Sequence, residues 1–160
     1  MKYYEDIIDE EISMANIDNN DKFLHLGCGS IPSTSILVAH KTGAIVTGID
    51  KNIRTVKEAR SCINMINHSD SRIQFKHAEA LNFSIENFDV IMVSQGIEPR
   101  REILEYISQH VKDDVRIILR TNSSVKGELT HHDMFLKKYF KISKIVSHEK
   151  HGLLISVMLF

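Results

Sequence analysis

The sequence has few of the residues that would build a cross-linked or membrane-embedded protein. Among its 160 residues are two cysteines, two prolines and no tryptophan. Two cysteines without a CxxC pair make neither a disulfide framework nor a structural zinc site. No apolar run approaches the roughly 20 residues of a membrane span, and the start, Met1 to Asp6, lacks the apolar core of a signal peptide. We therefore expect a cytoplasmic protein without a membrane partner.

An excess of charge of one sign is also missing. The chain has 20 Lys and Arg against 21 Asp and Glu, with a formal net charge of −1. No global basic field would therefore hold nucleic acid, which makes a nucleic-acid partner unlikely on this ground. The close basic residues Lys137, Lys138 and Lys141 are expected to form a solvated helix face.

The nine histidines do not indicate a metal site. The tight cluster His131-His132-Asp133 would lie on a helix, where adjacent side chains diverge by about 100° and cannot converge on one ion. We expect this cluster to be the exposed start of a helix capped by Thr130. His25 falls inside an apolar run and is expected to be a hydrogen-bonded core residue.

Apolar runs alternate with helical patterns along the chain, without repeats, linkers or low-complexity segments. The runs predict strands at 23–26, 44–50, 72–77, 88–93, 115–120, 142–148 and 153–160. Helices are predicted at 1–16, from Ser33 or Thr34 as cap to Gly43, and at 52–67, 99–110 and 131–140. Alternation of this kind requires right-handed crossovers and a mostly parallel sheet. We predict a Rossmann-like α/β fold of seven strands with an antiparallel C-terminal strand and helices on both faces.

The turn after the first strand reads Leu26-Gly27-Cys28-Gly29-Ser30-Ile31-Pro32. Glycines there let a ligand approach the backbone without an intervening Cβ, and the following helix offers unpaired N–H groups. The third glycine of the dinucleotide G-x-G-x-x-G pattern would fall at position 32, which is proline. That substitution disfavours close packing around a pyrophosphate.

Polar residues follow the next three strands. Asp50 ends the second strand, followed by Lys51, and an acid there can accept hydrogen bonds from both hydroxyls of a ribose. Glu79 and Ala80 follow the third strand, where an acid can accept from an adenine amino group. Ligands of open α/β sheets bind at the carboxyl ends of the strands, so we predict an S-adenosylmethionine (SAM) site with these residues: Gly27, Cys28, Gly29, Asp50, Lys51, Glu79, Ala80, Ser94 and Gln95.

Each element also has a plainer interpretation. The glycines could serve only a turn, Asp50 could cap the following helix, Glu79 could be a solvated loop acid, and Ser94 and Gln95 could belong to an ordinary loop. Cys28 is expected to line the turn as a small residue, because a nucleophilic cysteine needs a base in reach and the sequence indicates none.

Four further residues fall near the predicted ligand side. Arg120 and Asn122 leave the fifth strand there, to orient an acceptor carboxylate or to form a plain loop. Tyr3 and Tyr4 are placed where an N-terminal helix could fold over the cofactor.

These residues resemble the class I, Rossmann-like SAM-dependent methyltransferases from Asp21 to Phe160. The resemblance implies that Gly27, Gly29, Asp50 and Glu79 bind SAM. Residues 27–36 and 118–122 look like the Rossmann domain of nicotianamine synthases, in which a proline also follows the glycines. Those enzymes take the aminopropyl group of SAM and carry a helical domain before the Rossmann part, where this chain has about 16 residues.

We therefore expect a single SAM-binding domain over 1–160 that acts as a methyltransferase on a small-molecule acceptor. The sulfonium is already a good leaving group, so alignment and exclusion of water can provide most of the catalysis, and no catalytic residue is predicted. The alternatives are aminopropyl or aminobutyrate transfer, a SAM-binding subunit that needs a partner chain, and an NAD(P)-dependent oxidoreductase. A homo-oligomer is compatible with all of them.

Overall fold

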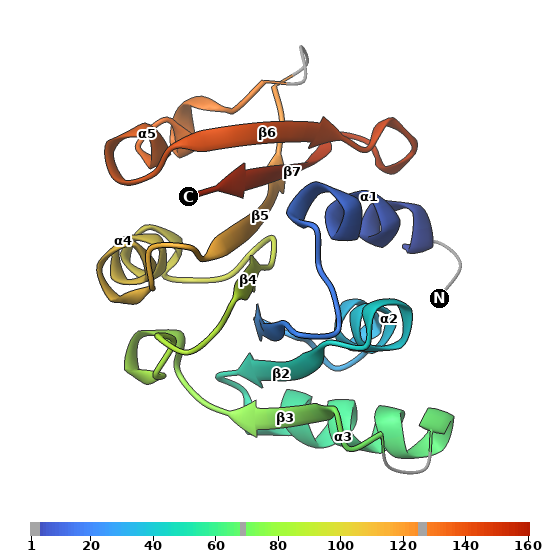
Figure 1. The fold of residues 1–160 in the computed structure, drawn as a ribbon. Coiled ribbons are helices and arrows are strands. Elements are labelled where there is room, and N and C mark those ends of the chain that lie inside the picture. Colours follow the sequence, from blue (N-terminus) through green and yellow to red (C-terminus); the bar gives the residue numbers. More distant parts are fainter. Residues whose placement is uncertain (1–3, 68–69, 125–127) are drawn as a thin grey trace.

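The centre of the molecule is one twisted seven-stranded sheet (Figure 1). The computed structural model describes residues 4–67, 70–124 and 128–160. The strands are β1 (Lys22–Leu26), β2 (Ile45–Asp50), β3 (Ile73–His77), β4 (Val90–Val93), β5 (Arg116–Asn122), β6 (Ile142–Ser147) and β7 (Leu154–Leu159). Their order is β3-β2-β1-β4-β5-β7-β6. Strands β1 to β5 pair in parallel, and β7 runs antiparallel to both β5 and β6, as the sequence predicts.

Helices cover both faces of this sheet. They are α1 (Glu5–Ala15), α2 (Ser33–Thr42), α3 (Ile53–Asn67), α4 (Arg100–His110) and α5 (Leu136–Tyr139), with short 3-10 turns η1 (Ala80–Asn82), η2 (His131–Asp133) and η3 (Glu149–His151). Side chains alternate along β4: Val90 and Met92 pack with α1 and α2, whereas Ile91 and Val93 pack with α4 and α5. Strands buried on both faces read as continuous apolar runs, which is why the sheet could be recognised in the sequence.

Two local predictions are wrong. Neither Ser33 nor Thr34 caps α2, because the N-cap position belongs to Pro32 and the helix already includes Ser33. The hydroxyls of Thr34 and Ser35 bond to Arg120 and His25 instead. The predicted helix 131–140 is divided into η2 and the four-residue α5, whereas Gly43 ends α2 in a left-handed conformation as predicted.

Gly48 in β2 leaves room for the side chains of Phe75 and Cys28 beside the strand. A Cβ at this position would lie 2.6 Å from Cδ1 of Phe75 and 2.9 Å from Cβ of Cys28. Phe75 therefore occupies space that any larger residue at 48 would need. The sequence shows only a glycine inside a strand, which can mark a close approach but does not identify the neighbour.

Helix α1 is attached to the C-terminal strands by polar contacts. Glu10 lies 2.9 Å from Nδ1 of His148, and the hydroxyl of Ser156 donates to the Glu11 carboxylate at 2.6 Å. His151 contacts Asp6 at 3.1 Å. These contacts join the first helix to the last hairpin, and α1 lies beside β5 and β7 (Figure 1).

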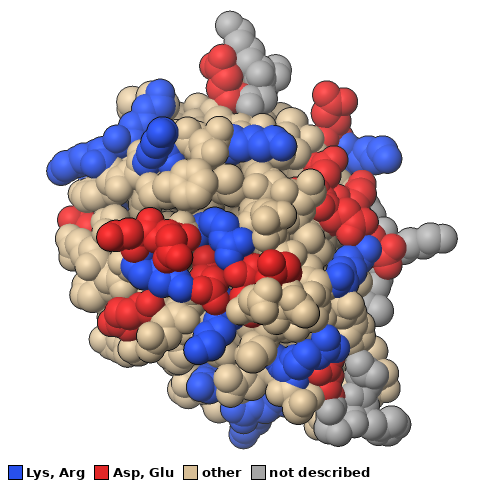
Figure 2. All heavy atoms as spheres, viewed as in Figure 1, with Lys and Arg blue, Asp and Glu red and all other residues tan. Residues whose placement is uncertain are grey.

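Charges of both signs are distributed over the surface. Figure 2 shows basic side chains over the end formed by α5 and β6 and a mixture of acids and bases elsewhere on that face. Lys137, Lys138 and Lys141 are exposed, but Lys141 lies beyond the end of α5 and is not part of a helix face. Among the described residues, none of the helices has the length and hydropathy needed to cross a bilayer.

Candidate functional site

The glycine turn and Asp50 lie next to each other at the carboxyl ends of β1 and β2. The backbone N–H groups of Gly27 and Cys28 both donate to the Ile49 carbonyl at 3.0 Å. The N–H of Gly29 donates to Oδ2 of Asp50 at 3.3 Å. Gly27 and Gly29 have φ values of 75° and 70°, which other residues adopt at a cost. The glycines therefore do more than end a strand, because their conformation brings the turn against the acid.

Asp50 also takes part in the start of α3. Its Oδ1 accepts from the N–H of Asn52 at 3.0 Å. The helix N-terminus itself is capped by Asn52, whose side-chain oxygen accepts from the N–H groups of Arg54 at 2.9 Å and Thr55 at 3.5 Å. Asp50 is therefore not simply the helix cap. One of its oxygens accepts from the glycine turn and the other from the residue before α3.

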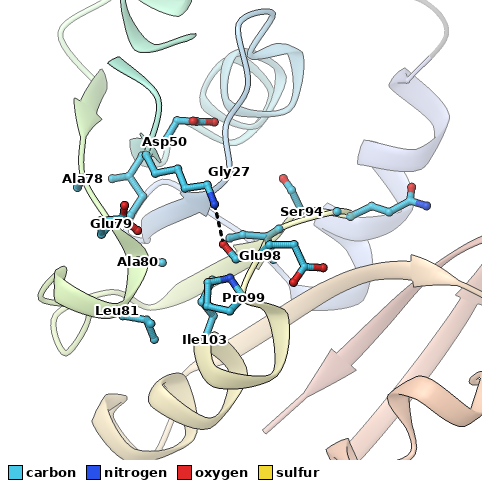
Figure 3. Close-up of a pocket in the computed structure, with 15 residues that line it drawn as sticks. Gly27, Asp50, Ala78, Glu79, Ala80, Leu81, Ser94, Glu98, Pro99 and Ile103 are labelled. Atoms are coloured by element: carbon cyan, nitrogen blue, oxygen red, sulfur yellow. Dashed lines mark hydrogen bonds between the residues drawn. The ribbon is translucent and has the colours of Figure 1, made fainter. Parts of the chain in front are cut away.

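A first cavity of about 270 Å³ opens beside this turn (Figure 3). Asp50, Glu79 and neighbouring residues form one wall, and Ser94, Glu98 and Pro99 form the other. The Nζ of Lys51 reaches across to donate to the Glu98 carbonyl at 3.2 Å. Seven predicted residues line this cavity: Gly27, Asp50, Lys51, Glu79, Ala80, Ser94 and Gln95. Apolar side chains complete the lining: Ile49, Leu81, Ile97 and Ile103.

A second cavity, of about 610 Å³, adjoins the first. Gly27, Ser94 and Gln95 line both cavities and thus form their junction. Gln95 donates from Nε2 to Oδ1 of Asn122 at 2.7 Å. The rest of the second cavity is mostly polar: Tyr4, His25, Cys28, Ile31, Ser33, Thr34, Arg120, Asn122, His151 and Leu154.

Two predicted residues, Gly29 and Cys28, do not line the first cavity. Gly29 lines neither cavity and contributes through its hydrogen bond to Asp50. Cys28 is buried and packs with Ile36 and Phe75. Burial, together with the nearby Asp50 charge, raises the pKa of its thiol to about 12. A thiol that stays protonated is a poor nucleophile, in agreement with the expectation that Cys28 lines the turn without acting as a nucleophile.

Arg120 lies within β5 and is held by a buried carboxylate. Its Nε and Nη2 donate to the two oxygens of Glu11 at 2.8 and 2.6 Å, and its Nη1 donates to the Thr34 hydroxyl at 3.0 Å. Glu11 is only 2% exposed. The loop alternative for Arg120 and Asn122 is therefore wrong, because both belong to the strand, and the guanidinium charge is balanced within the wall.

His25 connects the core to the junction of the cavities. Its Nδ1 lies 2.8 Å from the Ser35 hydroxyl and its Nε2 lies 2.8 Å from the Ser94 hydroxyl. Burial, with a further contribution from the Arg120 charge, lowers the pKa of the imidazole to about 3. The prediction of a hydrogen-bonded core histidine is confirmed. Its position beside the second cavity is new.

Other predicted positions have mixed outcomes. Tyr4 lines the second cavity and stacks on His151, whereas Tyr3 lies outside the described residues. Asp133 is buried and accepts from Thr121 and Arg100, so the expectation of an exposed helix start is wrong there. No cluster of three potential metal ligands occurs in the described part of the chain, and Thr130 makes no side-chain cap bond.

Comparison with solved structures identifies the class of fold. An RNA methyltransferase from Salinibacter ruber, in complex with S-adenosylhomocysteine, superposes with a TM-score of 0.72 at 16% identity, covering 96% of this chain and 88% of that one. The structure of a mutant of MtNAS in complex with SAM gives a TM-score of 0.86 at 22% identity, covering 98% of this chain and 61% of that one. The fold is thus the Rossmann-like fold of SAM-dependent methyltransferases, as the sequence predicts.

Sequence comparison then defines the family. The model of the nicotianamine synthase protein family matches residues 3–159, and the chain belongs to that family. An L-histidine 2-aminobutanoyltransferase from Pseudomonas aeruginosa is 26% identical over 118 residues, which cover 73% of this chain. The matched part is 44% of that relative, so the chain spans less than half the length of the curated proteins that it matches.

Proposed function

We propose that the protein is a SAM-dependent transferase that moves the 3-amino-3-carboxypropyl group of SAM to a nitrogen acceptor. The observation that supports this most strongly is the family match over residues 3–159, which includes every residue lining the first cavity. The curated relatives, named as L-histidine 2-aminobutanoyltransferases, support the same kind of transfer. We therefore rank this reaction ahead of methyl transfer, which the sequence pattern favoured.

In this proposal the adenosyl group occupies the first cavity. The Asp50 carboxylate, held in place by Gly29 and Asn52, would accept hydrogen bonds from the ribose hydroxyls. Glu79 would accept from the adenine amino group, and Ile49 and Leu81 offer apolar contact to the ring. Such a cavity, apolar with a few fixed polar groups, is the usual form of a small-molecule site.

The second cavity would receive the amino-acid part of SAM and the acceptor. It meets the first cavity at Gly27, Ser94 and Gln95, so a ligand spanning both would have its sulfur near that junction. The acceptor nitrogen would attack the γ-carbon, the carbon–sulfur electron pair would pass to sulfur to release methylthioadenosine, and the nitrogen would lose one proton. The chain's contribution is alignment and exclusion of water.

Methyl transfer is the second candidate. It is supported by the likeness of the fold to methyltransferases such as the precorrin-6y C5,15-methyltransferase from Geobacter metallireducens (TM-score 0.73, 15% identity). The same bound SAM would be attacked at the methyl carbon, and S-adenosylhomocysteine would leave. The two reactions therefore require the same first cavity and differ in the direction from which the acceptor approaches.

The products of the reaction test this proposal directly. Purified protein is incubated with SAM and either L-histidine or a panel of small amines, and the nucleosides are separated and identified by mass spectrometry. Methylthioadenosine together with an aminocarboxypropylated amine is the expected result. S-adenosylhomocysteine with a methylated acceptor would replace the proposal by methyl transfer.

Calorimetry with SAM separates the remaining outcomes. Binding without either product would mean that catalysis needs a further chain, whereas the absence of binding would overturn the SAM site itself. The Asp114→Ala variant is a suitable control for acid removal, because that side chain is 84% exposed and lines neither cavity.

A further inference from the structure

A buried histidine lies directly behind the junction of the two cavities. His25 contacts Ser35 on one side and Ser94 on the other, with both nitrogen–oxygen distances at 2.8 Å. Ser94 lines both cavities, whereas Ser35 is fully buried. The imidazole therefore connects an inaccessible hydroxyl to one that faces a ligand.

From this arrangement we propose that His25 is a positioning residue that turns the Ser94 oxygen toward the sulfonium of SAM. The inference rests on the proposed function, because it takes SAM to be the ligand at the junction. Ser94 would be the group near the ligand, and His25 would act through it.

The hydrogen-bonding capacity of a neutral imidazole supports this role. Such a ring has one donor and one acceptor nitrogen, so the two serines must have opposite roles. When Ser94 donates to Nε2, its oxygen lone pairs are left for the cavity. When Nε2 donates to Ser94 instead, the serine proton faces the cavity. A cationic ligand stabilises the first arrangement, because a lone pair attracts positive charge and a hydroxyl proton repels it.

The neutral state of His25 is essential to this choice. An imidazolium would donate from both nitrogens, which would leave the Ser94 proton directed at the ligand and add a second positive charge nearby. Burial and the Arg120 charge both disfavour protonation and lower the pKa of His25 to about 3. The same low pKa argues against His25 as a general base, because an imidazole with so low a pKa is a weak base near neutral pH.

The backbone around Ser94 fixes where its oxygen can go. Its N–H donates to the Leu26 carbonyl at 3.2 Å, which holds the end of β4 against β1. A Cβ on Gly27 would lie 3.4 Å from Cβ of Ser94, an ordinary contact distance, so the serine lies directly against the glycine turn. With the backbone held in this way, the hydrogen bond to His25 is what decides the direction of the hydroxyl.

The test compares a cationic with a neutral sulfur. SAM and S-adenosylhomocysteine share the nucleoside and the amino acid, but only SAM carries the sulfonium charge. We expect Ser94→Ala and His25→Phe each to weaken SAM binding about tenfold in calorimetry, since the electrostatic contact between the serine oxygen and the sulfonium charge is lost, and S-adenosylhomocysteine binding less than about twofold. The double variant should lose no more than either single one, because both act through one interaction.

A control variant and the affinities for the two nucleosides separate failure of the His25 role from failure of the proposed function. Ser61→Ala, in an exposed serine of α3, should change neither affinity. Equal losses for the two ligands, or multiplying losses in the double variant, would overturn the role of His25 while leaving SAM binding intact. Failure of the unaltered protein to bind either nucleoside would instead overturn the proposed function.

A second measurement does not depend on a variant that folds. Nitrogen chemical shifts of His25 in the unaltered, ligand-free protein should be those of a neutral ring throughout the range from about pH 5 to 8. Imidazolium shifts at about pH 6 would overturn the inference.

Discussion

The walls of the two cavities differ in how their polar groups are used. Around the first cavity, Asp50 and Lys51 lie at the carboxyl end of β2. Asp50 accepts hydrogen bonds from Gly29, 21 positions before it, and from Asn52, two positions after it. At the second cavity, the buried Glu11 holds Arg120, a lining residue that is 109 positions away in sequence, and the two charges balance each other. Side chains of the first kind remain accessible to a ligand, whereas those of the second kind hold the wall together.

The largest effect should come from breaking the buried ion pair. Glu11→Ala leaves the Arg120 guanidinium without its carboxylate in a buried place, and such a loss costs about 3–5 kcal/mol. Urea unfolding followed by circular dichroism measures the change in the free energy of unfolding. A loss of less than about 1 kcal/mol in the free energy of unfolding would mean that the ion pair contributes no more to stability than an ordinary surface residue does.

A paired replacement sharpens this result. Changing Glu11 to Leu and Arg120 to Met together removes both charges, so no uncompensated ion remains, and such replacements are often close to neutral. We expect the double variant to be more stable than Glu11→Ala alone. If the two were equally unstable, the cost would come from lost packing rather than from the charge.

Asp50 should show the opposite behaviour, with a large effect on binding and a small one on stability. Asp50→Ala leaves ribose hydroxyls unpaired, and we expect SAM affinity to fall by roughly 1–3 kcal/mol. Calorimetry with the Asp114→Ala control measures this. Unchanged affinity would separate Asp50 from the ligand and leave it as a support for the glycine turn and the start of α3.

The pH dependence of stability should report His25. The folded protein holds this pKa at about 3, below the ordinary value of 6.5, so the unfolded chain binds a proton between these values and the folded protein does not. Stability should therefore fall as the pH decreases from about 6.5, with a slope from this group approaching about 1.4 kcal/mol per pH unit.

Replacement of the histidine isolates its part of that slope. His25→Gln should flatten the dependence between about pH 5 and 6.5, above the range in which carboxylates titrate. Urea unfolding across this window is the measurement. An unchanged slope in the variant would show that His25 takes up its proton in the folded protein as readily as in the unfolded chain.

The smallest effect is expected at Lys51. Its ammonium joins the two walls of the first cavity by a hydrogen bond to the Glu98 carbonyl, but the contact is exposed. Lys51→Met should change the free energy of unfolding by less than about 0.5 kcal/mol, as is usual for surface positions. A loss as large as that of Glu11→Ala would remove the contrast between the two walls.

The same contrast explains what the sequence could predict. Strand patterns and the residues that follow each strand are local signals, and parallel pairing brings strand ends to one edge, so Asp50, Glu79 and Ser94 could be found together in advance. The pairing of Glu11 with Arg120 carries no such signal, although Arg120 itself could be placed at the end of the fifth strand. Glu11 is one of several acids on α1, and only the packed structure shows which of them faces the guanidinium.

Local signals also failed where tertiary contacts competed with them. Thr34 has the residue type of a helix cap, but its hydroxyl accepts a hydrogen bond from Arg120, on a distant strand. Asp133 follows two histidines in a polar segment, yet Thr121 and Arg100 bind it in the interior. In both cases a partner far along the chain decided the position of a side chain whose neighbours suggested solvent.

The attachment of α1 to the last hairpin has a consequence for synthesis on the ribosome. Glu11 and the serine that donates to it, Ser156, are 145 positions apart. At translation rates of roughly 5–20 residues per second, that separation corresponds to about 7–30 s. During this interval the nascent chain can already form β1 and β2 with the glycine turn. The acids of α1 have no contact with His148 and Ser156 until those residues have been made. The second cavity, which includes Tyr4, Arg120 and Leu154, is therefore completed only after β7 has been made.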